Sequence, residues 1–369
     1  MSEFFMPVRY FFGKNCLQKY SKALAQWGSP LLIITGKSSR INGSLDQLIA
    51  ELNQHGITHQ VVDTLSPNPR TDELSSIGET HRGENYKAII GLGGGSYIDA
   101  AKALALMLAT GIPAESLFDA AQRIRALPII AIPTTSGTGS EVTQYCVLND
   151  VTHHRKSGFG DALLFPKLSF LDPSFTVTLP LEVTRDTTLD ALSHLLEGIY
   201  SQNRNLTIYP LIIDGIRRIK ENLPECEADS QAWSVRESLM QASLYGGITI
   251  AQSSTTLQHS IGYPLTYHLG VPHGRANAMV MPLIIEFYSP AILPLLLEIL
   301  QAAGFHSLHN FYYWLEKRDI NFQCPGLNRL NLEELVETTF LARNTFLSPV
   351  PVTKKNLLVL YQKLAGRDT

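Results

Sequence analysis

The sequence has few cysteines, a small net charge and no long apolar run, and each of these features argues against a class of protein. Its four cysteines, Cys16, Cys146, Cys226 and Cys324, lie far apart and form no CxxC pair, which argues against a disulfide scaffold or a zinc ribbon. The net charge of −3 and the lack of a basic stripe give no sign of a nucleic-acid partner. No apolar run approaches the roughly 20 residues that a membrane span needs, and the first residues lack the pattern of a signal peptide. We therefore expect a cytoplasmic protein with no membrane or nucleic-acid partner.

What the chain does have is enough apolar material for two domains, with 369 residues of which 44% are hydrophobic. In its first half, short apolar runs of the β type alternate with amphipathic stretches of helical spacing. The expected strands cover residues 31–35, 59–62, 87–91 and 127–132, and the expected helices cover 43–56, 71–82 and 97–110. Such alternation predicts βαβ units, and hence a mainly parallel sheet with helices on both faces.

The β signal fades after Pro173, and the second half of the chain consists of helical patterns. The expected helices cover residues 184–201, 207–221, 232–254, 276–287, 290–303, 332–342 and 354–364. We therefore predict an α/β domain at residues 1–180 and an all-helical domain at residues 181–369.

A glycine-rich loop follows the third expected strand and opens a helix. It reads Gly93-Gly94-Gly95-Ser96, and Asp99 lies in the first turns of the helix. Backbone N–H groups at a helix N-terminus hold a pyrophosphate, and glycines let the phosphates approach. The loop departs from the GxGxxG fingerprint, because Ser96 occupies the third glycine position. The competing interpretation is a simple tight turn.

A second loop follows the next expected strand and is dense in hydroxyls and glycines. Its threonines Thr134, Thr135 and Thr138 suit contacts with phosphate or ribose. A surface turn rich in Ser and Thr is the alternative for this loop alone. Two such loops after neighbouring strands favour a nucleotide more than either loop does by itself.

The turn after the first strand bears on which dinucleotide binds. It reads Gly36-Lys37-Ser38-Ser39-Arg40 and has no acidic residue, which an NAD-selective site places near such a strand end. Two hydroxyls and two cations are able to receive a 2′-phosphate. The turn therefore favours NADP(H) over NAD(H), with a solvated basic turn as the alternative.

Candidate metal ligands are found in the helical half. Asp190 and His194 are four residues apart, so they share one helix face. His259 and His273 lie in a segment interrupted by glycines and prolines, which predicts one helix ending near residue 261 and another beginning at residue 272. One carboxylate and three imidazoles suit Fe(II) or Zn(II) better than Ca(II) or Mg(II). A local Asp–His hydrogen bond and ordinary loop histidines are the alternatives, and His268 has no clear partner.

Taken together, these motifs resemble those of the iron-containing (group III) alcohol dehydrogenase family over nearly the whole chain. The matching residues are Gly93, Gly94, Gly95, Ser96, Asp99 and Lys102; residues 133–143; Asp190, His194 and Glu197; and His259, Pro272, His273, Gly274, Ala276 and Asn277. The resemblance implies a dehydroquinate synthase-like fold, with a dinucleotide-binding first domain and a metal-binding second domain. It implies Asp190, His194, His259 and His273 as the metal ligands, and cofactor contacts from Asn68 and Lys156.

The resemblance also implies the reaction, a metal-dependent hydride transfer between the nicotinamide and a small primary alcohol or aldehyde. Tyr263 stands where many members carry a second histidine, so we treat it as a candidate contact to the substrate or nicotinamide. A glycerol dehydrogenase-like or maleylacetate reductase-like enzyme on the same fold is the nearest alternative, and a non-catalytic nucleotide-binding protein is a third. We expect the protein to be a homo-oligomer, namely a dimer.

Overall fold

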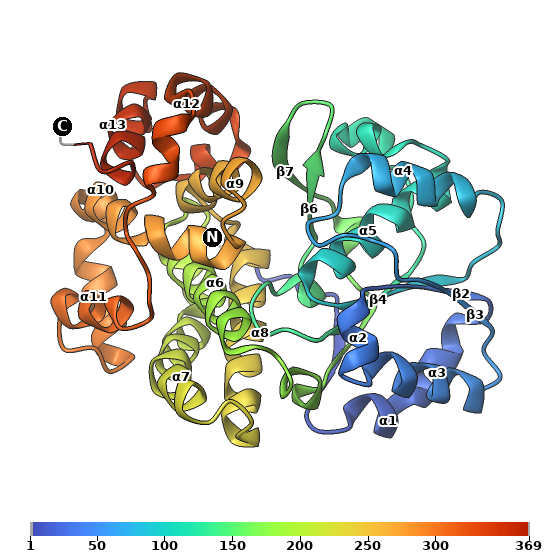
Figure 1. Ribbon diagram of the computed structural model, residues 1–369. Coiled ribbons are helices and arrows are strands. Elements are labelled where there is room, and N and C mark those ends of the chain that lie inside the picture. The colour runs from blue at the N-terminus through green and yellow to red at the C-terminus, as the bar shows by residue number, and fades with distance from the viewer. Residues whose placement is uncertain (1–2, 368–369) are drawn as a thin grey trace. The chain divides into compact units, whose positions relative to one another are not determined.

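The computed structural model describes residues 3–367, which form two compact units. One unit comprises Met6–Pro180 and Asp229–Met240, and the other comprises the remaining described residues. The division passes through helix α8 (Trp233–Ser253). The first unit contains a parallel sheet with flanking helices and the second is helical, so the predicted fold class is confirmed (Figure 1).

The α/β unit is built on a six-stranded sheet with the order β1-β8-β5-β4-β2-β3, in which neighbouring strands run parallel. Its strands are β1 (Arg9–Phe12), β2 (Leu31–Thr35), β3 (His59–Val62), β4 (Ala88–Gly93), β5 (Ile129–Pro133) and β8 (Leu168–Leu171). Its α-helices, apart from the part of α8 in this unit, are α1 (Cys16–Tyr20), α2 (Lys37–Ile41), α3 (Ser44–Gln54), α4 (Thr71–Thr80) and α5 (Gly95–Thr110). The crossovers between parallel strands bring β4 and β5 side by side, with Gly93 opposite Pro133.

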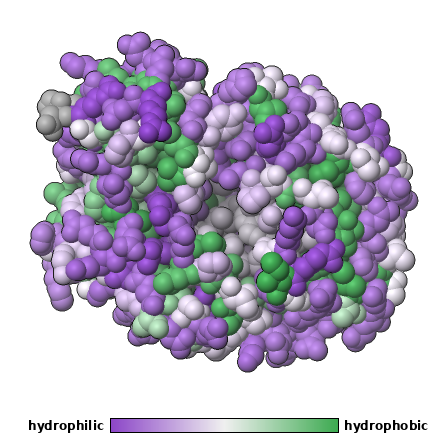
Figure 2. Space-filling view, viewed as in Figure 1, coloured by the Kyte–Doolittle hydropathy of each residue, from purple (hydrophilic) through white to green (hydrophobic). Residues whose placement is uncertain are grey.

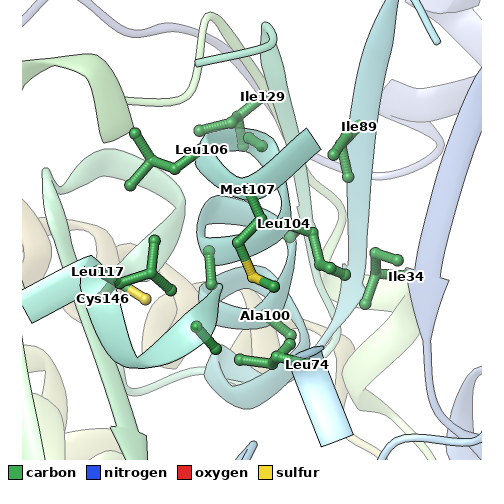
Figure 3. Packing of buried hydrophobic residues seen from close by; sticks show 14 of the residues in the cluster. Ile34, Leu74, Ile89, Ala100, Leu104, Leu106, Met107, Leu117, Ile129 and Cys146 are labelled. Atoms are coloured by element: carbon green, nitrogen blue, oxygen red, sulfur yellow. The ribbon is translucent and has the colours of Figure 1, made fainter. Parts of the chain in front are cut away.

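Successive strand residues face the two sides of this sheet, because side chains alternate along a strand. Leu32 and Ile34 of β2 pack in the core around α5, whereas Leu31 and Ile33 pack with residues of α1 and α3. Figure 3 shows the first of these cores, with Leu104 and Met107 of α5 surrounded by residues of neighbouring strands and helices. Burial on both faces explains why strands such as β2, β4 and β5 have continuous apolar sequences rather than alternating patterns.

Several elements of the α/β unit differ from the sequence-based expectation. An antiparallel hairpin of β6 (Tyr145–Asp150) and β7 (Arg155–Gly160) lies outside the main sheet. Only alternate residues of β6 are buried, and β7 is mostly half-buried. The pair therefore has too little apolar sequence to indicate strands, and no strand was predicted there. The polar turn after β2 is the short helix α2.

The helical unit contains part of α8 and seven further α-helices among the described residues. These are α6 (Leu181–Tyr200), α7 (Tyr209–Ala228), α9 (Leu257–Leu269), α10 (His273–Ala302), α11 (Leu308–Glu316), α12 (Leu332–Leu341) and α13 (Lys354–Leu364). The expectation of separate helices at 276–287 and 290–303 is wrong, because α10 continues through Pro290 and Pro294. The carbonyls that these prolines leave without an intrahelical partner belong to Glu286 and Pro290, which are both exposed residues.

The segment that carries His259 also differs from the expectation. Helix α8 ends at Ser253, and Ser254 takes a left-handed conformation with φ of 61°. A new helix, α9, then begins at Leu257, so His259 lies in a first turn rather than at a helix end. Gly262 and Pro264 lie inside α9, which ends at Gly270 in the left-handed conformation.

Helix α10 is long and apolar enough to cross a membrane by length and composition alone, which the sequence analysis did not anticipate. Part of this helix packs within the protein, since one of its faces is buried in the core of the helical unit and 39% of its most apolar window is buried. Residues on that face include Ile284, Ile285, Tyr288, Ile292, Leu296 and Ile299. Core helices of large domains carry this composition without meeting lipid. On the face drawn in Figure 2, hydrophilic residues predominate and hydrophobic residues lie among them in separate groups.

Candidate active site

Three helices of the helical unit carry the four expected metal ligands. Helix α6 supplies Asp190 and His194 from one face, as their spacing of four predicts. His259 lies in the first turn of α9, and His273 is the first residue of α10. Asp190, His194 and His259 are buried, while His273 is partly exposed.

The donor atoms of these side chains converge on one point. The Oδ1 atom of Asp190 lies 4.0 Å from Nε2 of His194, 3.8 Å from Nε2 of His259 and 3.9 Å from Nε2 of His273. The Nε2 atoms of His194 and His259 are 3.1 Å apart. Ligand atoms of Asp190, His259 and His273 all lie within 4.8 Å of one another. Because a tetrahedral ion with bonds of about 2.1 Å separates its donors by about 3.4 Å, this arrangement fits a first-row divalent cation.

Glu197, one turn after His194 on α6, contacts His259, one of the expected ligands. Its Oε2 accepts a hydrogen bond from Nδ1 of His259, and its Oε1 accepts from Thr256 N at 2.6 Å and Oγ1 at 2.7 Å. Burial acts to raise the pKa of Glu197, but the His259 ring and the Thr256 donors hold that pKa below its ordinary value. An ionised carboxylate only accepts, so the proton is on Nδ1 and the Nε2 lone pair faces the other ligands.

Asn277, four residues after His273, is a second orienting residue. Its Nδ2 lies 2.8 Å from Oδ1 of Asp190, 3.1 Å from Nε2 of His259 and 3.4 Å from Nε2 of His273. Its Oδ1 is so close to Gly262 that a Cβ there would approach it to 2.2 Å. Glu197 and Asn277 belong to the matching motifs, but no role was predicted for them; their helical spacing from His194 and His273 was the available signal.

A close contact between two helices sets the position of His273. A Cβ on the next residue, Gly274, would lie 1.9 Å from the carbonyl oxygen of Asp186 and 2.9 Å from Cβ of Asp190. Arg275 donates from Nε to Oδ1 of Asp186 at 2.9 Å. The first turn of α10 is therefore held tightly against α6.

Two further residues of α9 lie near the histidines in sequence. The half-buried ring of Tyr263 stacks on His273, with ring centroids 5.5 Å apart and planes at 16°, and meets His259 edge-on at 6.2 Å. His268 is exposed and packs edge-on against Tyr267. The structure therefore brings Tyr263 to the ligand cluster, whereas His268 lies on the surface.

The two glycine- and threonine-containing loops meet at the carboxyl edge of the sheet in the α/β unit. Thr134 N donates to the carbonyl of Gly93 at 2.9 Å. A Cβ on Gly95 would lie 2.6 Å from Thr138, and a Cβ on Gly94 would lie 3.4 Å from Thr135. Side-chain-free backbone at this edge, next to the N-terminus of the 16-residue helix α5, is suited to a pyrophosphate.

Three other residues expected to contact the cofactor, Asn68, Ser96 and Lys156, are joined by hydrogen bonds. Asn68, which has a left-handed φ of 57°, donates from its backbone N to Ser96 Oγ at 3.1 Å. Lys156 on β7 donates from Nζ to Oδ1 of Asn68 at 2.8 Å. Asp99 differs, since its Oδ1 accepts from Ser140 Oγ at 2.5 Å and its Oδ2 accepts from Val147 N at 2.9 Å. Both carboxylate oxygens of Asp99 are thus engaged within the protein.

The turn after β2 contributes fewer exposed groups than the sequence suggests. Ser39 is buried and its Oγ donates to the carbonyl of Leu92, and Gly36 is buried beneath the ring of Tyr97. Lys37 and Ser38 are exposed. Arg40 pairs at 2.7 Å with Asp63, an acidic residue directly after β3 that the sequence analysis overlooked.

Comparisons with known proteins show the family to which the chain belongs. The protein-family model described as "Iron-containing alcohol dehydrogenase" matches residues 7–173. A second family model, described as "Fe-containing alcohol dehydrogenase family, C-terminal", matches residues 184–365. Alcohol dehydrogenase 4 of Schizosaccharomyces pombe is 30% identical over 292 residues, which are 78% of this chain and 69% of that protein. The chain belongs to the iron-containing alcohol dehydrogenase family. It is therefore an alcohol oxidoreductase, as expected.

Solved structures of iron-containing alcohol dehydrogenases share the fold. The iron-containing alcohol dehydrogenase of Thermotoga maritima superimposes with a TM-score of 0.91 and 34% identity, over 99% of this chain and 100% of that one. Sulfoacetaldehyde reductase of Bifidobacterium kashiwanohense, solved in complex with NAD+, gives a TM-score of 0.89 with 26% identity over 100% of both chains.

Proposed function

We propose that this enzyme is a metal-dependent alcohol dehydrogenase that transfers hydride between NADP(H) and a small primary alcohol or aldehyde. The observation that carries the proposal is the convergence of one carboxylate and three imidazoles in the helical unit. A protein that only bound a nucleotide would have no use for such a donor set.

Asp190, His194, His259 and His273 would hold the metal, Fe(II) or Zn(II). When bound, the ion supplies Lewis-acid polarisation of the substrate oxygen. The chain's contribution is orientation: Glu197 fixes the ring of His259, and Asn277 donates to Asp190. Tyr263, stacked on His273, presents an aromatic ring and a hydroxyl to the same region, so we propose that it contacts the substrate or the nicotinamide.

The nicotinamide carries the hydride when the dinucleotide is bound. We propose that its phosphates lie against the loops at residues 93–96 and 134–138, with Asn68 and Lys156 as further contacts. Preference for NADP(H) is supported by exposed Lys37 and Ser38 in the turn after β2. Arg40 adds less to this argument than Lys37 does, because its charge is already paired with Asp63. The related Bifidobacterium kashiwanohense structure contains NAD+.

The test is an assay of NADPH and NADH oxidation against a panel of small aldehydes, with metal-loaded and chelator-treated protein. We expect turnover that chelation abolishes and that added Fe(II) or Zn(II) restores. The His259→Ala variant should lose metal and activity but still bind the dinucleotide. Turnover by that variant, or activity that survives full metal removal, would refute the ligand assignment.

The same panel separates the alternative reactions on this fold. Glycerol as the preferred substrate would indicate a glycerol dehydrogenase-like enzyme, and metal-independent reduction of maleylacetate would indicate a maleylacetate reductase-like enzyme. Dinucleotide binding without any turnover would indicate a binding protein. The expected dimer and the cytoplasmic location stay predictions, which light scattering on the purified protein and cell fractionation test.

A further inference from the structure

Lys102, in the second turn of α5, is a fully buried lysine whose ammonium group is surrounded by acceptors. Its Nζ lies 2.8 Å from Ser140 Oγ, 2.7 Å from the carbonyl of Tyr145 and 3.0 Å from the carbonyl of Thr143. Its side chain is 0% exposed. An ammonium group has three protons, so these three acceptors satisfy it completely. Burying such a charge is costly unless it is paired and hydrogen-bonded, and here it is both.

Asp99, three residues earlier on the same helix, is the charged partner. Its Oδ1 lies 3.8 Å from Nζ of Lys102. The same oxygen accepts from Ser140 Oγ at 2.5 Å, and Oδ2 accepts from the backbone N of Val147 at 2.9 Å. The hydroxyl of Ser140 therefore bridges the two charges.

These contacts tie one helix to one short segment of chain, residues 140–147. That segment directly follows the loop at residues 134–138, and Gly139 between them is left-handed with φ of 65°. Helix α5 begins at Gly95, inside the other proposed phosphate loop. The side chains of Asp99 and Lys102 thus fix the second loop relative to the helix that carries the first.

We propose that Asp99 and Lys102 are positioning residues that hold the loop at residues 134–138 in its dinucleotide-binding form without touching the dinucleotide. The proposal deepens the function proposed above and rests on it. It gives Asp99 a different role from the cofactor contact expected from the sequence. The reason is that each of its carboxylate oxygens already accepts a hydrogen bond within the protein, from Ser140 or from Val147.

The test compares Lys102→Met and Ser140→Ala with the wild-type protein, by titrating each with NADPH and NADH and following nucleotide fluorescence. We expect the dissociation constant to rise at least tenfold in Lys102→Met and severalfold in Ser140→Ala. Turnover at saturating nucleotide and the metal content should stay within about twofold. A residue needed only for folding would reduce the amount of active protein, and hence kcat, and would leave the dissociation constant of the folded fraction unchanged.

Tyr86→Phe is the matched control, because it removes a hydroxyl that donates to Gln60 Oε1 at 2.7 Å and lies 2.7 Å from His81 Nδ1, in the same unit and away from both loops. It should bind NADPH as the wild type does. If Lys102→Met does not fold, Ser140→Ala decides the question, since it deletes only the bridging hydroxyl. Unchanged nucleotide affinity in the folded variants would overturn the proposal, whereas a wild-type protein that binds neither nucleotide would overturn the proposed function instead.

Discussion

The carboxylate of Glu197 accepts a hydrogen bond from Nδ1 of His259, on the side of the ring opposite the nitrogen that faces Asp190. This contact orients the ring and fixes its tautomer. Glu197→Gln should therefore lower the affinity for Fe(II) or Zn(II) by about 10- to 100-fold, the usual effect of losing such a partner. Metal content after dialysis against a graded chelator measures the loss. Glu286→Gln, which alters a surface pair with Lys363, is the control, and equal metal retention by both variants would contradict the role.

Gly274→Ala should damage the metal site through the backbone. The added methyl group would meet the carbonyl oxygen of Asp186 and Cβ of Asp190, so the first turn of α10 has to move away from α6. Such overpacking costs about 1–3 kcal/mol and displaces His273, and both the free energy of unfolding and the metal content should fall. Gln301→Ala, on an exposed part of the same helix, should change the unfolding free energy by no more than about 0.5 kcal/mol. A variant with full metal content would show that the contact does not position His273.

Glu141 should make the stability of the protein depend on pH. Burial is the main cause that raises the pKa of this carboxyl from 4.5 to about 7. The folded state then holds the proton more tightly than the unfolded state does, so stability falls as pH rises from about 4.5 to 7 and levels off above. This difference in pKa between the folded and unfolded states corresponds to about 3 kcal/mol.

Denaturant unfolding across this pH range measures that slope. The free energy of unfolding of Glu141→Gln should increase relative to that of the wild type as pH rises to about 7. Replacement of the exposed Glu115 by Gln should leave the wild-type slope intact. Parallel pH profiles for wild type and Glu141→Gln would disprove the assignment.

The Tyr263→Phe variant keeps the aromatic ring of this residue and removes its hydroxyl. The stacking on His273 depends on the ring alone, so we expect unchanged metal content. If the hydroxyl contacts the substrate as proposed, kcat/KM for the aldehyde should fall about tenfold, the value of a lost hydrogen bond of about 1.4 kcal/mol. Steady-state kinetics on metal-loaded protein provide the measurement, and an unchanged kcat/KM would remove Tyr263 from the substrate contacts.

The sequence predicted those parts of the fold that depend on local patterns. Strands β2 and β3 and helix α13 begin and end where the apolar spacing places them. Helix α9 was missed because Gly262 and Pro264 resemble helix breakers, whereas in the structure Gly262 admits the close approach of Asn277. Such a contact joins residues from two helices and leaves no periodic trace in the sequence.

The candidate site shows the same division between local and tertiary information. The spacing of Asp190 and His194 on one helix indicated a shared face, and the structure brings both to His259 and His273. The partners that depend on tertiary packing could not be read in advance. One of these partners is Thr256, which donates to Glu197. Another is Asp63, which follows β3 and pairs with Arg40 in the turn after β2.

The four cysteines, which first argued against a disulfide scaffold, have a practical consequence. All four are thiols outside any disulfide and are buried, with Cys16 and Cys146 in the α/β unit and Cys226 and Cys324 in the helical unit. A thiol-reactive dye should therefore label the native enzyme only when a unit opens. Mapping which cysteines react first would report separately on the opening of each unit, without any engineered label.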